Sequence, residues 1–160
     1  LFLEPKALYN APKASAPIPD DFEVPFGKAR LRREGEDLSI ITYGNTTPMC
    51  VELADKFNEE GLASLEVLDL RSLSPLDTET ILASVRKTGK ALVVHEDKVF
   101  AGFGGEVVSV INEEAFEFLD GPVRRVGSTF TPVGFNRILE AAILPGLERI
   151  RRAATELLEY

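Results

Sequence analysis

Three short runs constrain the fold more than any other feature of the chain. They are "LSIITY" (38–43), "LEVLDL" (65–70) and "ALVVH" (91–95). A run that is apolar and β-branched at nearly every position is typical of a strand buried on both faces, whereas a strand with one solvated face alternates. Strands of this kind need helices on both sides of their sheet. The sequence therefore predicts an α/β fold with a largely parallel sheet.

Helical patterns alternate with these runs, and two weaker strand patterns complete the set. The strand patterns cover residues 27–33 and 122–126. Because only the turn at residues 34–37 joins 27–33 to 38–43, we expect these two strands to form an antiparallel hairpin. The prediction is a three-layer α/β/α sandwich whose mixed five-stranded sheet has one antiparallel edge strand. Helices are expected at residues 48–60, 78–87 with Asp77 as N-cap, 105–118, 132–144 and 145–158.

The amino-acid composition excludes or disfavours several classes of function. The 160 residues, 44% of them hydrophobic, suffice for one compact domain, and a net charge of −8 disfavours nucleic-acid binding and favours a basic protein partner. The single cysteine, Cys50, excludes an internal disulfide framework and a Cys-rich zinc site, and we expect it to be buried on a helix. No membrane-length apolar run or signal peptide is evident, so we expect a cytoplasmic protein with no membrane partner.

The stretch "HEDKVFAGFGGE" (95–106) holds the only histidine together with several acids and glycines. Its glycines, Gly102, Gly104 and Gly105, lack the spacing of a dinucleotide-binding loop, and no Lys-Ser/Thr pair of a phosphate-binding loop follows. The acids would repel a phosphate group. We expect a turn whose glycines adopt positive φ and allow close helix packing.

His95 is the candidate for acid–base chemistry in this stretch. A histidine beside carboxylates can act as a general base, but Glu96 should point to the opposite face of the strand and so should not orient it. No nucleophile is evident, and one histidine with scattered acids gives no metal-ligand spacing. We predict no catalytic residue and no metal site in this chain. A structural or interface role for His95 is favoured over a catalytic one.

A series of motifs in fixed order resembles one enzyme family over essentially the whole chain. The motifs are "FLEPKALY", "VPFGKARLRREGEDLSIITYG", "VLDLRSLSPLDTETILASVRKTGKALVVHED", "AGFGGE" where relatives have the pattern GGFGxE, and "AFEFLDGPVRRVGSTFTPVGF". Together they resemble the C-terminal part of the beta subunit of thiamine-diphosphate-dependent 2-oxo acid dehydrogenases. "FLEPK", "VVHED" and the terminal "LLEY" are more similar to the branched-chain, 2-oxoisovalerate type. "VGSTFTPVGF" is also similar to bacterial chains with fused alpha and beta parts.

The resemblance implies a transketolase C-terminal-domain fold for residues 26–160. It implies that residues 1–9 end a preceding pyrimidine-binding domain, and the proline-rich residues 10–25 are predicted to be a linker. In this family thiamine diphosphate and magnesium are held by the full enzyme. We therefore expect this chain to bind no cofactor and to be inactive alone, and we expect a bacterial, cytoplasmic parent enzyme.

The resemblance also implies a function in assembly. The full enzyme would decarboxylate branched-chain 2-oxo acids and pass the acyl group to a lipoyl arm, while this domain contacts the alpha part, a symmetry-related beta part and the dihydrolipoyl acyltransferase core. The expected core-docking residues are Glu156, Glu159 and Tyr160. The residues expected to form an interface or active-site entrance loop are His95, Glu96, Gly102, Phe103, Gly104 and Gly105.

Other functions stay open at this point. A pyruvate dehydrogenase or another transketolase-like enzyme, such as a deoxyxylulose-phosphate synthase, would share the fold. A stand-alone module could bind a small anion in the crevice at the carboxyl ends of the strands. A pyrimidine-binding domain in the parent protein would favour the dehydrogenase, and stabilisation by a phosphate or nucleotide would favour the module.

Overall fold

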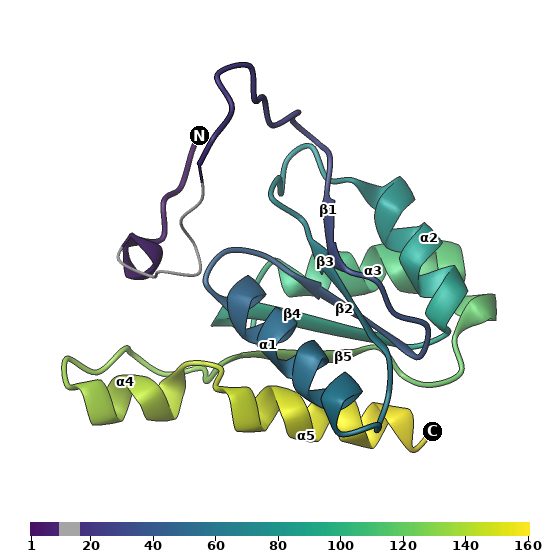
Figure 1. Ribbon diagram of the computed structural model, residues 1–160. Coiled ribbons are helices and arrows are strands. Elements are labelled where there is room, and N and C mark those ends of the chain that lie inside the picture. Colours follow the sequence, from purple (N-terminus) through teal and green to yellow (C-terminus); the bar gives the residue numbers. More distant parts are fainter. Residues whose placement is uncertain (10–16) are drawn as a thin grey trace.

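Five strands form one mixed sheet with helices packed on both of its faces (Figure 1). The structure is a computed structural model that describes residues 1–9 and 17–160. The order of strands across the sheet is β1-β3-β2-β4-β5. The strands are β1 (Arg30–Arg33), β2 (Leu38–Thr42), β3 (Leu65–Asp69), β4 (Ala91–Lys98) and β5 (Arg124–Ser128). The helices are α1 (Thr46–Glu59), α2 (Thr78–Thr88), α3 (Gly104–Ala115), α4 (Arg137–Ile143) and α5 (Leu147–Leu158), with short 3₁₀ turns η1 (Lys6–Leu8) and η3 (Phe116–Phe118).

Two separate hydrophobic cores fill the spaces between the layers. One core joins the sheet to α1 and α5 through residues such as Leu53, Phe57 and Ile150, and the other joins it to α2 and α3. All five residues of β2 are buried, so both faces of this strand are covered. Each fully buried large apolar side chain contributes roughly 1.5–3 kcal/mol relative to exposure. The predicted three-layer α/β/α sandwich with a mixed five-stranded sheet is confirmed.

The predicted hairpin between the first two strands is wrong, although the antiparallel edge strand itself is present. β1 pairs antiparallel with β3, with Arg30 opposite Asp69, and β3 lies between β1 and β2. The short connection crosses the beginning of β3, where the backbone N–H groups of Glu36 and Asp37 both donate to Ser64 O at 3.0 Å. β3 is almost wholly buried and needs two neighbours, whereas the charged β1 tolerates the edge.

The crossing requires a glycine at position 35. A Cβ atom built on Gly35 would lie 2.2 Å from the carbonyl carbon of Leu65. The connection therefore runs directly against the backbone of β3. The short length of the turn indicated neighbouring strands, but a short turn can also step over the end of an intervening strand.

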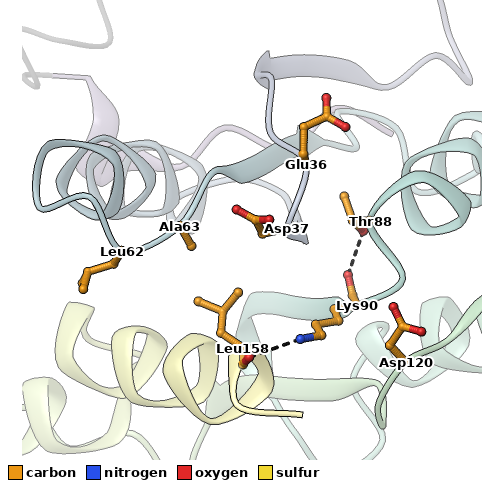
Figure 2. Close-up of a pocket in the computed structure, with 8 residues that line it drawn as sticks. All are labelled: Glu36, Asp37, Leu62, Ala63, Thr88, Lys90, Asp120 and Leu158. Carbon is orange, nitrogen blue, oxygen red and sulfur yellow. Dashed lines mark hydrogen bonds between the residues drawn. The ribbon is translucent and has the colours of Figure 1, made fainter.

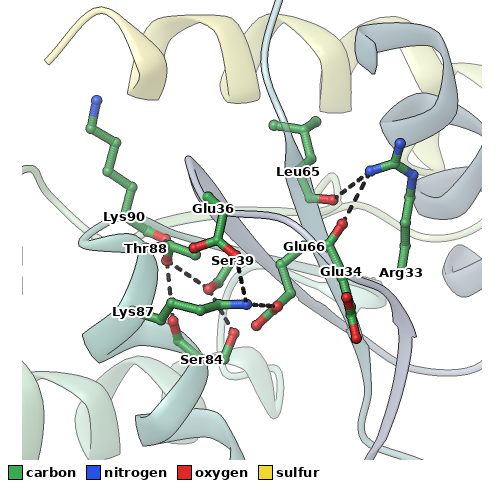
Figure 3. A network of polar contacts seen from close by, with 10 residues as sticks. All are labelled: Arg33, Glu34, Glu36, Ser39, Leu65, Glu66, Ser84, Lys87, Thr88 and Lys90. Carbon is green, nitrogen blue, oxygen red and sulfur yellow. Dashed lines mark hydrogen bonds and ion pairs between the residues drawn. The ribbon is translucent and has the colours of Figure 1, made fainter. Parts of the chain in front are cut away.

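Polar side chains buried in the sheet are paired with α2 (Figure 3). Ser39 Oγ lies 2.6 Å from Ser84 Oγ and 2.7 Å from Thr88 Oγ1. Glu66, which is 3% exposed, pairs with Lys87. Because a buried polar group without a partner costs about 1–3 kcal/mol, these contacts fix how α2 lies on the sheet.

The helix ends agree with the local signals in the sequence. α1 ends just before Gly61, whose φ is +66°, and Cys50 is buried on α1 as predicted. The closing pair of helices was also predicted, but α4 begins at Arg137 and is shorter than expected. Of the predicted linker, residues 10–16 lie outside the described residues, and residues 17–25 are exposed. Within the described ranges, no helix is long and apolar enough to cross a membrane.

Asp77 connects the beginning of α2 to the segment before β1. Its carboxylate accepts from the backbone N–H of Thr80 at 3.3 Å, from Thr80 Oγ1 at 2.8 Å and from the backbone N–H of Ala29 at 2.9 Å. Replacing Asp77 by Ala removes the cap and leaves the N–H of Ala29 without a partner. We expect a loss of about 2 kcal/mol in the free energy of unfolding, measured by urea denaturation.

The control for this variant is Glu79→Ala. The Glu79 side chain is 88% exposed in the same helical turn and lies 3.6 Å from Lys28 Nζ. We expect Glu79→Ala to change stability by less than about 0.5 kcal/mol. Equal effects of the two substitutions would show that Asp77 is not a cap.

Candidate functional site

The predicted loop at the carboxyl edge of the sheet is organised around a buried His95. His95 lies in β4 and has no exposed surface. The ring of Tyr43 is parallel to the imidazole, with an interplanar angle of 3° and centroids 6.1 Å apart, and Phe103 meets Tyr43 edge-on. His95 is thus part of the packing beneath the loop and does not face solvent in this chain.

Three glycines enclose the imidazole. A Cβ built on Gly104 would lie 2.4 Å from His95 Cδ2 and Nε2, and those on Gly127 and Gly102 would lie 2.9 Å and 3.0 Å from Cε1. At Gly104 the imidazole occupies the space that a side chain would take, whereas at Gly102 and Gly127 the backbone oxygens of Lys98 and Asp97 are closer still, at 2.1 Å and 2.7 Å. The predicted close packing is present, but the predicted positive φ is wrong for Gly102, Gly104 and Gly105, because the residue with positive φ in this loop is Ala101, at 56°.

The chemistry of His95 is limited by its surroundings. Neither Nδ1 nor Nε2 has a hydrogen-bond partner among the described residues. Burial lowers the pKa of His95, the charge of Arg125 acts in the same direction, and the charge of Asp97 opposes both. The imidazole is enclosed in this chain, and its structural or interface role stays a prediction.

The Glu96 side chain points away from that of His95, as the alternation of side chains along a strand predicted. Its side chain is exposed and accepts a hydrogen bond from Asn45 Nδ2 of the neighbouring loop. Phe103 and Gly105 are half-buried, and Gly102 and Gly104 are buried. Of the six residues predicted for an interface or entrance loop, Glu96 is therefore the one with an exposed side chain. The interface role of this loop stays a prediction.

A second candidate region lies at the amino edge of the sheet, beside the C-terminus (Figure 2). A cavity of about 380 Å³ is lined by three carboxylate residues, Glu36, Asp37 and Asp120, around a floor that includes Leu62 and Leu158. The residues completing the lining are Ala63, Thr88 and Lys90. Acidic groups around an apolar floor suit a basic side chain with an aliphatic stem.

The lysine in this cavity is already engaged. Lys90 Nζ donates to Leu158 O at 3.2 Å, and its backbone oxygen accepts from Thr88 Oγ1 at 3.0 Å. The lysine thus ties the end of α5 to the beginning of β4. Of the carboxylates around the cavity, Glu36 lies 3.9 Å from Lys87 Nζ, and Asp37 accepts from the backbone N–H of Ser64 at 2.7 Å.

The predicted docking residues do not line this cavity, although Tyr160 lies beside the corner that carries Asp120. A Cβ on Gly121 would lie 3.2 Å from the Tyr160 side chain, so Tyr160 packs beside the Asp120–Gly121 corner. Glu156 and Glu159 are exposed on the last turns of α5, and Glu156 lies 4.0 Å from Arg152. Sequence reasoning missed Asp120, Glu36 and Asp37, because no local motif connects them to the C-terminus.

A larger hollow of about 640 Å³ lies against α1 and includes Leu8, Arg32 and Asp69 in its lining. Arg32 lies 3.8 Å from Asp69, and burial raises the pKa of Asp69 despite the opposing effect of the nearby basic groups. Within the described residues, no cluster of three or more His, Cys, Asp or Glu side chains could hold a metal ion.

A mixed sheet in this strand order, enclosed by helices on both faces, defines an α/β/α domain of the transketolase C-terminal class. The chain belongs to the family of transketolase C-terminal domains, and the match covers residues 27–150. The chain of a split-gene transketolase, described as an inactive beta4 tetramer, superposes with a TM-score of 0.75 at 27% identity, over 89% of this chain and 45% of that one.

Curated relatives include beta subunits of two kinds of 2-oxo acid dehydrogenase. The pyruvate dehydrogenase E1 component subunit beta of Bacillus subtilis is 41% identical over 160 residues, covering 100% of this chain and 48% of the relative. The 2-oxoisovalerate dehydrogenase subunit beta of Pseudomonas aeruginosa is 38% identical, covering 99% and 48%. The chain thus spans about half the length of these relatives. The two types are similarly close, so the branched-chain type is not singled out.

The enclosure of His95 predicts a dependence of stability on pH. Because the pKa is lower in the folded than in the unfolded chain, the unfolded state binds more protons once the pH falls below about 6.5, and the free energy of unfolding decreases toward acid. His95→Gln cannot titrate. We expect its stability relative to the parent protein to improve as the pH falls from about 7.5 to 5.5. Urea denaturation of both proteins across this pH range measures the difference. If the free energies of unfolding of His95→Gln and of the parent protein change equally with pH, the prediction is wrong.

The packing of Gly104 against the imidazole predicts a steric effect. Gly104→Ala places a methyl group against His95 and should cost about 2 kcal/mol in the free energy of unfolding. Gly105→Ala is the matched control, because its Cβ would meet only the flexible end of Arg125 at 3.3 Å and alanine favours the helix. Thermal unfolding of both variants checks the difference, and equal melting temperatures would refute it.

Proposed function

We propose that this chain is the C-terminal domain of the beta part of a thiamine-diphosphate-dependent 2-oxo acid dehydrogenase, with a role in holding subunits together and docking the acyltransferase core. The observation that carries the proposal is the alignment of the whole chain with beta subunits of such dehydrogenases, at 41% and 38% identity. The domain-family match supports it.

The parent enzyme would release carbon dioxide from a 2-oxo acid and transfer the acyl group to a lipoyl arm. Thiamine diphosphate supplies that chemistry when bound. We expect this chain to bind no cofactor by itself and its residues to act in assembly. The proposed substrate class is 2-oxo acids, and the branched-chain preference stays a prediction from the motifs of the sequence.

The acidic corner beside the C-terminus supports the docking role. Its carboxylates (Glu36, Asp37 and Asp120) surround apolar surface at Leu62 and Leu158. A small basic domain of the dihydrolipoyl acyltransferase could place a cationic side chain there, since complementary charge speeds encounter and fixes orientation. Glu156 and Glu159 are also exposed, on the last turns of α5.

The exposed apolar side chains of the domain support contacts with other chains. Phe100, Phe130 and Phe135 are 65%, 68% and 109% exposed. We propose that surfaces of this kind contact the alpha part or a second beta part. The split-gene transketolase chain with the same fold is described as a beta4 tetramer, which supports self-association of this type of chain.

The docking role is tested by calorimetric titration with the basic subunit-binding domain of the acyltransferase. We expect Asp120→Lys to weaken binding by tenfold or more, on the order of the effects seen for close interfacial charges. Glu148→Lys is the matched control, because it reverses an exposed charge at the opposite end of α5. Equal affinities of the two variants, or no binding by the parent protein, would overturn the docking proposal.

A further inference from the structure

His95, the only histidine of the chain, occupies a closed compartment in β4. The imidazole has no exposed surface, and neither of its nitrogens has a hydrogen-bond partner among the described residues. A Cβ built on Gly104 would lie 2.4 Å from Nε2, and one on Gly102 would lie 3.0 Å from Cε1, so the backbone fits closely around the ring. A charged imidazole has two N–H groups that need acceptors or water. The compartment therefore favours the neutral ring.

Titratable groups face the imidazole from the elements packed around it. Burial is the largest influence and lowers the pKa of the ring, the charge and backbone oxygen of Asp97 on β4 oppose it, and the charge of Arg125 on β5 adds to it. Tyr43, which stacks on the ring, has a pKa raised to about 12 by burial and so is neutral. Glu96 bonds Asn45 of the neighbouring loop, and Glu106 in the first turn of α3 is exposed. The surroundings thus disfavour a proton on the closed ring.

The loop that follows the imidazole is the weakest wall of the compartment. The pairing of β4 with β5 is irregular at the level of the ring, and residues 96–101 are exposed or half-buried. Ala101 has a φ of 56°, a left-handed conformation that costs about 1–3 kcal/mol for a residue other than glycine. Val99 is held by its N–H, which donates to Ser128 O at 3.1 Å, and by its oxygen, which accepts from Arg125 Nη1 at 2.9 Å. Exposed segments of this kind open at lower free energy than the core.

The other walls cannot yield without disrupting the core. β4 is paired with β2 from Ala91 to Val94, immediately before the imidazole. α3 is fixed by Val107 and Ile111, which have no exposed surface. An opening that hydrates the ring at the lowest free energy is therefore confined to the loop.

We propose that residues 96–102 form a pH-sensitive cover, which is closed over the neutral imidazole of His95 and opens when the imidazole binds a proton. In the open state water reaches both ring N–H groups, and the face of Tyr43 is uncovered. The cover goes beyond the proposed function, because it needs neither a partner nor a cofactor. Its test is therefore independent of the docking result.

The direction and size of the response follow from linkage. A hydrated histidine in the open loop has a pKa of about 6.5, and the closed ring has a lower one. The open state thus binds more protons, and its population rises as the pH falls below about 6.5. Between pH 7.5 and 5.5 the equilibrium constant for opening should increase by up to about tenfold.

Hydrogen exchange of the 160-residue protein, followed by NMR and corrected for the intrinsic pH dependence of exchange, tests the cover. We expect the amides of Val99 and Gly105, which are hydrogen-bonded in the closed loop, to be less protected than that of Ile40 and to open several times more at pH 5.5 than at pH 7.5. His95→Gln should remove this pH dependence. Loop amides that do not respond to pH, or that are as well protected as Ile40, overturn the proposal.

The imidazole gives an independent readout that does not require replacing it. Because the chain has a single histidine, its ring signals are followed without ambiguity, and we expect them to change with the same midpoint pH as the loop amides. Arg125→Gln removes the nearby charge and keeps an N–H donor for Val99 O, so the midpoint should move to higher pH. Arg124→Gln is the matched control on the same exposed strand end and should leave it unchanged. Equal shifts of the two variants, or a ring that titrates while the loop amides stay constant, overturn the proposal.

Discussion

The central constraint on this domain is the burial of its three middle strands on both faces. β2, β3 and β4 are apolar almost throughout, so neither side of the sheet can face water. α1 and α5 cover one side, and α2 and α3 cover the other. The helices cannot be removed singly without exposing a core, and the loops at both ends of the strands are positioned by this packing.

The edges of the sheet carry the remaining features of interest. At the carboxyl edge His95 is enclosed by glycines and fixes the loop above it, while Glu96 remains at the surface. At the amino edge, the turn before β2, the end of α5 and the Asp120–Gly121 corner converge on one acidic hollow. The carboxyl edge is tightly packed around the imidazole, and the amino edge is hollowed and lined by carboxylates.

The two surfaces proposed for partners differ in their physical character. The corner beside Tyr160 is acidic and suits a basic protein, where charge governs orientation and rate of encounter. The surface that carries Phe130 and Phe135 is apolar and suits apolar packing, where shape and area govern stability. They lie at opposite ends of α5, so both can be occupied in one assembly. Their separation also lets each contact be altered without disturbing the other.

The sequence by itself determined the layers, the parallel core strands and the ends of α1 and α2, because apolar periodicity, Asp77 and Gly61 act over a few residues. It also determined that Glu96 would point away from His95. Only the tertiary structure decided that β3 separates β1 from β2, that the glycines near His95 serve packing, and that Asp120, Glu36 and Asp37 meet beside the C-terminus. These arrangements depend on contacts between residues far apart in the chain, and such contacts leave no local pattern to read.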